Sequence, residues 1–156
     1  KVLQKKIPLN NVLSKYFKRK YYHPNLCINL TNKLLSFANT SIDISDGLFA
    51  DLDKLINKQK LSYKIYLKKI PISKSLNKLI NLKILKKISS VSCGDDYQIL
   101  FTAPPSKSRI ISKTSKSLGI KISKIGKICN NREKSQIIDE KNKKIAIKSK
   151  GYFHKF

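Results

Sequence analysis

Acidic residues are scarce in this sequence, and their scarcity makes their positions informative. Nine Asp and Glu residues stand against 34 Lys and Arg residues in 156, which gives a formal net charge of +25. Six of the nine acids fall in two short clusters, at residues 43–53 and 95–96. Because a bias toward lysine leaves carboxylates mainly where something requires them, we look for chemistry at these two clusters.

Arginine is also scarce, and this argues against a nucleic-acid reader. Only three of the 34 basic residues are Arg, and the other 31 are Lys. Arginine makes the bidentate contacts that read bases and phosphates, and the aromatic residues here do not repeat between basic ones as a stacking surface requires. The charge therefore indicates a genome-wide nucleotide bias, and we expect no specific nucleic-acid partner.

Cysteine pairs and long apolar runs are lacking as well. Cys27, Cys93 and Cys129 are odd in number and include no CxxC pair, which argues against a zinc site or a disulfide framework and for a reducing compartment. No apolar run approaches the roughly 20 residues that span a bilayer, and residues 1–9 lack the apolar core of a signal peptide. We expect a cytoplasmic protein without a membrane partner.

Helical and strand periods alternate along the chain. The apolar spacing predicts helices over residues 26–37, from residue 48 onward, within 75–88 as one or two pieces, and over 106–118. Strands are predicted at 41–44, 63–67 and 97–103, with two or three more in 120–147 around a polar turn near Asn130. No linker or repeat divides the chain, so we expect one domain over 1–156, of the α/β or α+β class with a mixed sheet.

The first acidic cluster lies where a predicted strand turns into a predicted helix. In IDISDGL, Asp43 is in the strand, Ser45 and Asp46 are in the turn, and Gly47 lets the backbone approach closely. Carboxylate oxygens are hard ligands for Mg²⁺, and the N–H groups of a helix start favour phosphate. The alternative is that Asp46 is only an N-cap. This leaves Asp43 unexplained, because Asp is disfavoured in strands.

The remaining acids have simpler explanations. Asp51 and Asp53 fall in the first turns of the predicted helix, where they favourably meet its dipole and nearby lysines, so we interpret them as structural. Asp95 and Asp96 precede a predicted strand. Adjacent carboxylates repel, which favours a cation, a hydrogen-bonding ligand or opposite faces, and a solvated turn is the alternative.

Four segments together resemble a known family. IDISDGLFADL, CGDDYQILFTAPP, KISKIGKI and the terminal GYFHKF are similar, in order and spacing, to the C-terminal half of thiamine-monophosphate kinase, in the superfamily of aminoimidazole ribonucleotide synthetase and selenophosphate synthetase. The resemblance runs from about Tyr22 to Phe156. The family's N-terminal half has no counterpart here, so we expect a C-terminal-type domain that works with an N-terminal domain and forms a homodimer when complete.

The resemblance implies ATP-dependent transfer of a phosphoryl group to thiamine monophosphate, which gives thiamine diphosphate. It assigns Asp43 and Asp46 to Mg²⁺, Ser45 to the nucleotide, and Asp95 and Tyr152 to the thiamine moiety. These residue types suit the chemistry, because phosphoryl transfer needs mainly positioning and charge neutralisation. An aromatic face and a carboxylate likewise suit a flat cationic ring.

Three positions depart from the family pattern. Cys93 stands where the family usually has Gly, Asp95 where it has Glu, and Gln98 where it has Glu. Asp95 is one methylene shorter than Glu, which weakens its expected contact with substrate. Two alternatives stay open: a sibling enzyme of the superfamily with another acceptor, and a basic binding module whose affinity would fall steeply with salt.

Overall fold

The computed structural model describes residues 7, 9–56, 59–130 and 134–146, and these ranges contain two sheets. In the first sheet, β1 (Thr40–Asp43) pairs antiparallel with β3 (Ile99–Thr102). The second sheet has the order β4-β2-β5-β6, formed by β2 (Leu61–Tyr66), β4 (Gly126–Asn130), β5 (Gln136–Ile138) and β6 (Lys144–Ile145). This sheet is mixed, because β2 runs parallel to β5 and antiparallel to β4.

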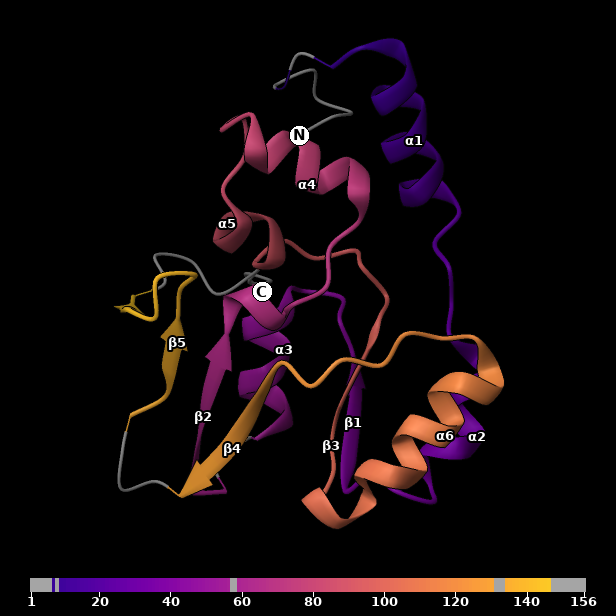
Figure 1. Cartoon of the computed structure of the whole chain (residues 1–156), viewed down its shortest axis with the longest axis vertical. Helices are drawn as coiled ribbons and strands as arrows, with labels where there is room; N and C mark the ends of the chain where they lie inside the picture. Colours follow the sequence, from indigo (N-terminus) through magenta and orange to yellow (C-terminus); the bar gives the residue numbers. More distant parts are fainter. Residues whose placement is uncertain (1–6, 8, 57–58, 131–133, 147–156) are drawn as a thin grey trace, which may run out of the picture.

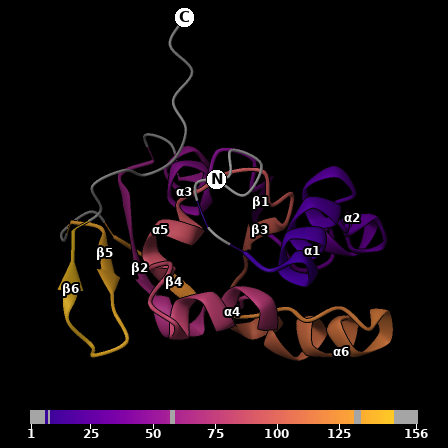
Figure 2. The same cartoon turned by 90° about the horizontal axis from the view of Figure 1, so that it is seen from above.

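The helices of the described ranges lie between and beside these sheets (Figure 1). They are α1 (Asn11–Tyr22), α2 (Ile28–Leu34), α3 (Leu48–Leu55), α4 (Lys74–Asn81), α5 (Lys87–Val91) and α6 (Ser108–Leu118), with short 3-10 turns at Leu67–Lys69 and Pro105–Lys107. Figures 1 and 2 both place α3 between the two sheets, and α2 and α6 on the side away from β5. The helix α3 is thus the element that both sheets share.

Two apolar clusters hold these elements together. The larger one centres on α3, where Phe49 and Leu52 pack with Tyr63 and Ile65 of β2 and with Leu100 of β3. Burying one such side chain contributes about 1.5–3 kcal/mol, so this cluster fixes α3 against both sheets. As a result, the turn that precedes α3 is held at the end of β1.

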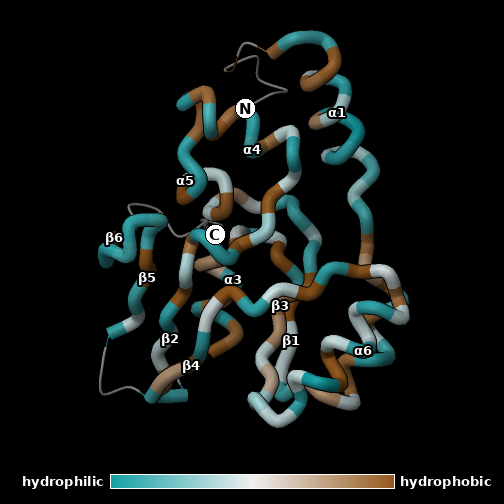
Figure 3. The backbone as a smooth tube through the Cα atoms, viewed as in Figure 1, coloured by the Kyte–Doolittle hydropathy of each residue, from teal (hydrophilic) through white to brown (hydrophobic). Residues whose placement is uncertain are grey.

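The smaller apolar cluster joins α2 to α6. Leu30, Leu34 and Phe37 are buried, and Ile111 and Leu118 of α6 pack against them. Apolar and polar stretches alternate along α6 (Figure 3), as expected for a helix that packs one face against a neighbour and leaves the other in solvent. Gly119 ends α6 at φ 62°, a left-handed conformation that glycine adopts without a steric penalty.

The fold class and most elements predicted from the sequence are confirmed. The stretch 75–88 forms two helices, α4 and α5, and the tail forms β4, β5 and β6. Two predictions need correction. The sheet is divided into two, and the helix predicted at 26–37 covers only Ile28–Leu34, with Leu26 exposed before it.

The helix α1 was not predicted. Asn10 caps it, since its side chain accepts a hydrogen bond from the Leu13 backbone N–H at 2.9 Å. Its apolar positions Leu13, Tyr16 and Phe17 have helical spacing, but no residue of α1 is buried. In addition, no helix among the described residues is both long and apolar enough to cross a bilayer.

Candidate functional site

The turn between β1 and α3 is organised by a buried carboxylate. Asp51 is 0% exposed, and its Oδ2 accepts hydrogen bonds from the backbone N–H groups of Ser45, Asp46 and Gly47 at 3.0, 3.0 and 3.1 Å. Hydrogen bonds to a charged acceptor are the strong ones in proteins. Asp51 therefore fixes the backbone of the turn from inside the first cluster of acids.

The expectation that Asp46 caps α3 is wrong. Gly47 occupies the N-cap position at φ 122°, and no side chain caps the helix there. The Asp46 carboxylate instead pairs with Lys54, whose Nζ lies 2.5 Å from Asp46 Oδ2 and 2.8 Å from Asp51 Oδ1. These two hydrogen bonds raise the pKa of Lys54, the one to Asp46 more strongly.

The two acidic motifs meet through their backbones. Beyond the β1–β3 ladder, Ile44 N–H donates to the Gln98 carbonyl at 2.8 Å, and Tyr97 N–H donates to the Ile44 carbonyl at 2.9 Å. Asp95 N–H then donates to the Ser45 carbonyl at 2.9 Å. The turn of the first motif therefore lies directly against the loop of the second, although about 50 residues separate them in sequence.

A glycine in each motif makes this approach possible. A Cβ on Gly94 would lie 2.0 Å from the Ser45 carbonyl oxygen, and a Cβ on Gly47 would lie 2.5 Å from the Ser92 carbonyl oxygen. Real Cβ atoms do not come this close to a backbone oxygen. Each motif thus needs its glycine because the other motif's backbone occupies the space of a side chain.

Tyr97 follows the acids of the second motif and contacts one of them. Its hydroxyl donates to Asp95 Oδ1 at 3.3 Å. Its pKa is raised, first by the charge of Asp95, then by that hydrogen bond, and more weakly by Tyr21 and Asp43. Asp43 and Asp95 are therefore within electrostatic reach of one phenol. Asp95 and Tyr97 both have left-handed backbones, at φ 65° and 50°, a strain that clusters at functional sites.

Asp96 carries an unusual carboxyl group. The residue keeps exposed surface, but neighbouring atoms withdraw its carboxyl group from water, and this desolvation, with the charge of Asp95 second, raises its pKa to about 6. The shift arises from crowding in the loop and not from enclosure in the core.

The structure brings four of the five predicted site residues to one junction. Asp43 ends β1, Ser45 and Asp46 form the turn, and Asp95 is bonded through its backbone to Ser45. Tyr152 lies outside the described residues. Gln98 also belongs to this neighbourhood, because its amide donates to the carbonyls of Asn25 and Asp96 at 3.4 and 3.3 Å.

Sequence reasoning missed what Asp51, Lys54 and Tyr97 do here. Asp51 was interpreted as a structural acid for the helix dipole, and its structural role is instead to hold the turn. Lys54 is one of 31 lysines, so its sequence position carried no signal. Asp53 was also interpreted as structural. Burial raises the pKa of Tyr63, and the charge of Asp53 and its hydrogen bond with the tyrosine raise it further.

The described part of the chain has no preformed metal-binding cluster of three or more His, Cys, Asp or Glu side chains. This arrangement suits Mg²⁺ better than zinc. Magnesium keeps several waters and is usually held by one or two carboxylates together with phosphate oxygens. Asp43 and Asp46 are carboxylates of this kind, so the donor chemistry fits.

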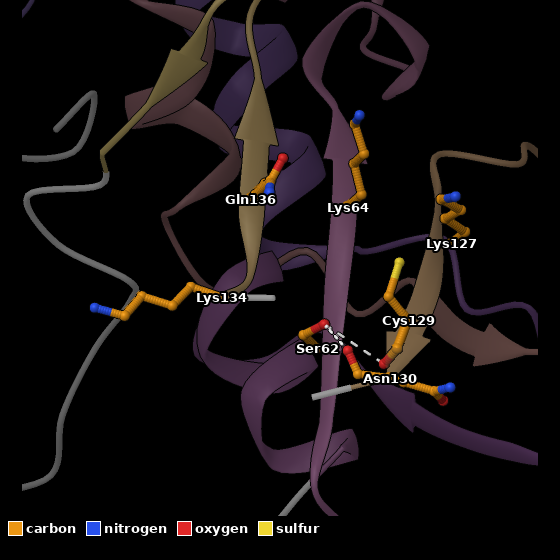
Figure 4. A pocket seen from close by; sticks show the side chains of 7 residues that line it. All are labelled: Ser62, Lys64, Lys127, Cys129, Asn130, Lys134 and Gln136. Carbon is orange, nitrogen blue, oxygen red and sulfur yellow. Dashed lines mark hydrogen bonds between the residues drawn. The ribbon is translucent and has the colours of Figure 1, made fainter. Parts of the chain in front are cut away.

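A separate hollow of about 350 Å³ opens on the other side of the four-stranded sheet from α3 (Figure 4). Lys64 lies opposite Lys127 of β4 and Gln136 of β5, and the Ser62 hydroxyl donates to the Asn130 carbonyl at 2.9 Å. Lys134 also lines it, and none of the described lining residues carries a carboxylate. None of its lining residues belongs to the two acidic motifs, so it is not the predicted site.

Comparison with known proteins places the chain among relatives of small-molecule kinases. No protein-family model matches it. It is 35% identical over 155 residues to the thiamine-monophosphate kinase of Buchnera aphidicola subsp. Schizaphis graminum, an alignment that covers 98% of this chain and 47% of that protein. The chain is thus homologous to thiamine-monophosphate kinases, and it spans about half the length of the curated relatives it matches.

Solved structures support the same fold. A thiamine-monophosphate kinase from Stenotrophomonas maltophilia K279a matches with a TM-score of 0.71 at 23% identity, over 88% of this chain and 44% of that one. A structure of AaThiL complexed with AMPPCP and TMP matches with a TM-score of 0.70 at 23% identity, over 97% and 45%. The expected α/β class with this arrangement of elements is therefore the fold of these kinases.

Proposed function

We propose that this chain is the C-terminal part of a Mg²⁺-dependent thiamine-monophosphate kinase. The enzyme would transfer the γ-phosphoryl group of ATP to the phosphate of thiamine monophosphate, which yields thiamine diphosphate. The observation that carries the proposal is the junction of the two motifs, where main-chain hydrogen bonds hold the turn that carries Asp43, Ser45 and Asp46 against the loop that carries Asp95. The relatives' name and the AMPPCP and TMP complex of one structural neighbour support the same substrates.

Within this proposal Asp43 and Asp46 would hold Mg²⁺, which would supply positive charge to offset that of the phosphate groups. Asp51 keeps the turn rigid, so the carboxylate of Asp46 and the backbone of Ser45 stay in place as the nucleotide arrives. Ser45 contacts the nucleotide. Positioning of this kind is the main service that phosphoryl transfer asks of a protein.

The second motif would receive the acceptor. Asp95 faces the cationic ring of thiamine, and the Tyr97 hydroxyl holds its carboxylate at 3.3 Å. Tyr152 supplies an aromatic face for the same ring. Since Asp95 is shorter than the Glu of the family pattern, we expect weaker binding of thiamine monophosphate, with a higher KM rather than a lower kcat.

The whole enzyme would need more than this chain. An N-terminal domain would complete the nucleotide site, and we propose a homodimer in the cytoplasm, with no specific nucleic-acid partner. Cys27, Cys93 and Cys129 are free thiols. Exposed apolar side chains such as Val12, Leu26 and Ile28 support the proposal that another domain or subunit covers part of this surface.

The test is product formation by the full natural protein that contains this chain. With ATP and thiamine monophosphate, we expect thiamine diphosphate in the presence of Mg²⁺ and none with excess EDTA. Aminoimidazole ribonucleotide precursors and selenide serve as the sibling acceptors. Turnover of one of these in place of thiamine monophosphate would refute the proposed substrate. Affinity for an anionic partner that does not depend on Mg²⁺ and falls steeply with salt would favour the basic binding module.

A further inference from the structure

Lys54 lies in α3, six residues after the IDISDGL motif, but its ammonium contacts the acids of that region. Its Nζ contacts Asp46 Oδ2 at 2.5 Å and Asp51 Oδ1 at 2.8 Å. Asp46 is the carboxylate that the proposed function assigns to Mg²⁺. A cation of the protein's own therefore already occupies one oxygen of the proposed metal ligand.

We propose that Lys54 is the resident counter-ion of the metal site. Its ammonium holds the Asp46 carboxylate in place while no metal is bound, and it leaves Asp46 when a divalent cation binds. This inference rests on the metal role of Asp46 in the proposed function. It makes Lys54 a positioning residue that sets how tightly the site takes its metal.

Charge at the junction supports an exchange rather than joint binding. Two cations beside one carboxylate repel each other, and the repulsion is large where little water separates them. The Asp46 side chain is only 17% exposed, so solvent screens such a pair weakly. Among the described residues, Asp51 is the second carboxylate that contacts Lys54, and it is already paired with the Lys54 ammonium.

The geometry also permits Lys54 to leave. Its side chain is 50% exposed and has a flexible four-carbon stem, which can turn the ammonium into water. The turn does not depend on it, because the other oxygen of Asp51 binds the N–H groups of Ser45, Asp46 and Gly47. Departure of Lys54 therefore removes the ammonium from the Asp46 carboxylate without releasing the backbone that carries it.

The first measurement is calorimetric titration of the full natural protein that contains this chain with Mn²⁺ alone, as a stand-in for Mg²⁺. Lys54→Met keeps most of the side-chain volume and removes the competing charge, and Lys54→Arg keeps the charge. We expect Lys54→Met to bind Mn²⁺ about fivefold more tightly or better, a coupling of ordinary size between linked sites. Lys54→Arg should bind like the wild type.

A second measurement needs no variant, so it stands even where Lys54→Met fails to fold. The rate at which acetic anhydride acetylates Lys54 is followed by peptide mass spectrometry with and without Mn²⁺. We expect Mn²⁺ to speed acetylation of Lys54, because the metal releases its ammonium. Lys33, an exposed lysine of α2, is the internal control and should not change.

The outcomes separate this inference from the proposed function. If the wild type binds Mn²⁺ but the reactivity of Lys54 stays constant, Lys54 is not the counter-ion, and the metal role of Asp46 survives. Equal Mn²⁺ affinity of a folded Lys54→Met and the wild type would likewise overturn the counter-ion role alone. If the full natural protein binds no Mn²⁺ at all, both the counter-ion and the metal site are overturned.

Discussion

Gly94 and Gly47 make the closest contacts between the two acidic motifs. Each lies where a Cβ would enter the space of a backbone oxygen from the other motif. The requirement is a shared one, since the turn after β1 and the loop before β3 can pair only when both positions lack a side chain. The same contact sets Asp95 beside Ser45, on which the proposed substrate site depends.

We expect Gly94→Ala to destabilise the fold by about 3 kcal/mol, at the upper end for overpacked sites, because its Cβ would meet the Ser45 carbonyl at 2.0 Å. Gly119→Ala is the matched control. It has φ 62° but nothing within 4 Å, so only backbone strain of about 1 kcal/mol applies there. Urea unfolding of both variants measures the difference. Equal losses would mean that the motifs do not touch as described.

The raised pKa of Asp96 predicts a pH dependence of stability. The folded state holds its proton up to about pH 6, while the unfolded chain loses it near pH 3.8. The folded state therefore binds more protons between these values, and stability falls as pH rises through this window. Above about pH 6 the ionised carboxylate disfavours the folded state.

Asp96→Asn should remove this penalty. We expect the variant to be more stable than the wild type at pH 7 and equal to it at pH 4. The exposed surface of Asp96 allows solvent to screen its charge, so the gain stays below about 1 kcal/mol. Thermal unfolding across this pH range measures it. A gain that persists unchanged at pH 4 would exclude ionisation as the cause.

At the residue scale, the sequence indicated which acids are candidate site residues better than it indicated which side chains contact them. Asp43 was singled out because an acid in a strand needs a reason, and Asp95 because adjacent acids repel. Asp51 escaped notice because an acid in a first helical turn already has a common explanation. The role of Lys54 could not be predicted in a chain with 31 lysines, because its position contrasts with nothing.

At the scale of elements, α1 and α4 differ in what stabilises them: both have a capping side chain, but only α4 buries a residue in the core. Both begin at a capping side chain, Asn10 for α1 and Ser73 for α4. However, α1 buries no residue, whereas Leu79 of α4 is only 1% exposed. Isolated helices of this length are marginal in water, so α1 relies on its cap far more than α4 does.

We therefore expect Asn10→Ala to unravel the start of α1. Loss of a cap costs about 1 kcal/mol, and α1 has no buried side chain to offset it. Hydrogen exchange at residues 13–17 should become fast, with little change in global stability. Ser73→Ala, the control, should lower global stability by a similar amount while α4 stays protected. Unchanged protection in α1 would show that other contacts hold the helix.

At the scale of elements, periodicity predicted most helices and strands. The α3 and α6 patterns persisted because α3 is largely buried and the apolar side chains of α6 pack against α2. The strands β1 and β2 persisted because their residues alternate, and β3 persisted as a short apolar run. The division into two sheets was not predictable, because it depends on how α3 packs between them. Neither was α1, whose apolar face is only partly buried in the described part of the chain.

For the whole molecule, charge is the dominant property. A formal net charge of +25 makes like charges repel throughout the compact state. Lys64 and Lys127, opposite each other across β2 and β4, are a local instance. Screening should therefore stabilise the fold, and the effect should be strongest where added salt shortens the Debye length most.

We expect Tm to rise by about 3 °C or more, which corresponds to about 1 kcal/mol at this chain length, when NaCl is added. Most of the rise should occur between about 0.01 and 0.15 M, where the Debye length falls from about 30 to 8 Å. Differential scanning calorimetry at fixed pH measures it. A Tm that falls or stays constant over this range would contradict net repulsion.

The central claim is that the junction of the two acidic motifs is a metal–nucleotide site of a thiamine-monophosphate kinase. The most direct measurement compares formation of thiamine diphosphate by the full natural protein with that of its Asp43→Asn and Glu140→Gln variants. Glu140 is an exposed acid of the β5–β6 turn, outside both motifs.

We predict that Asp43→Asn lowers kcat by about 100-fold or more, the usual cost of removing a group that positions transition-state charge, and weakens Mn²⁺ binding in a protein that still folds. Glu140→Gln should leave both unchanged. Full activity of a folded Asp43→Asn variant would contradict the account.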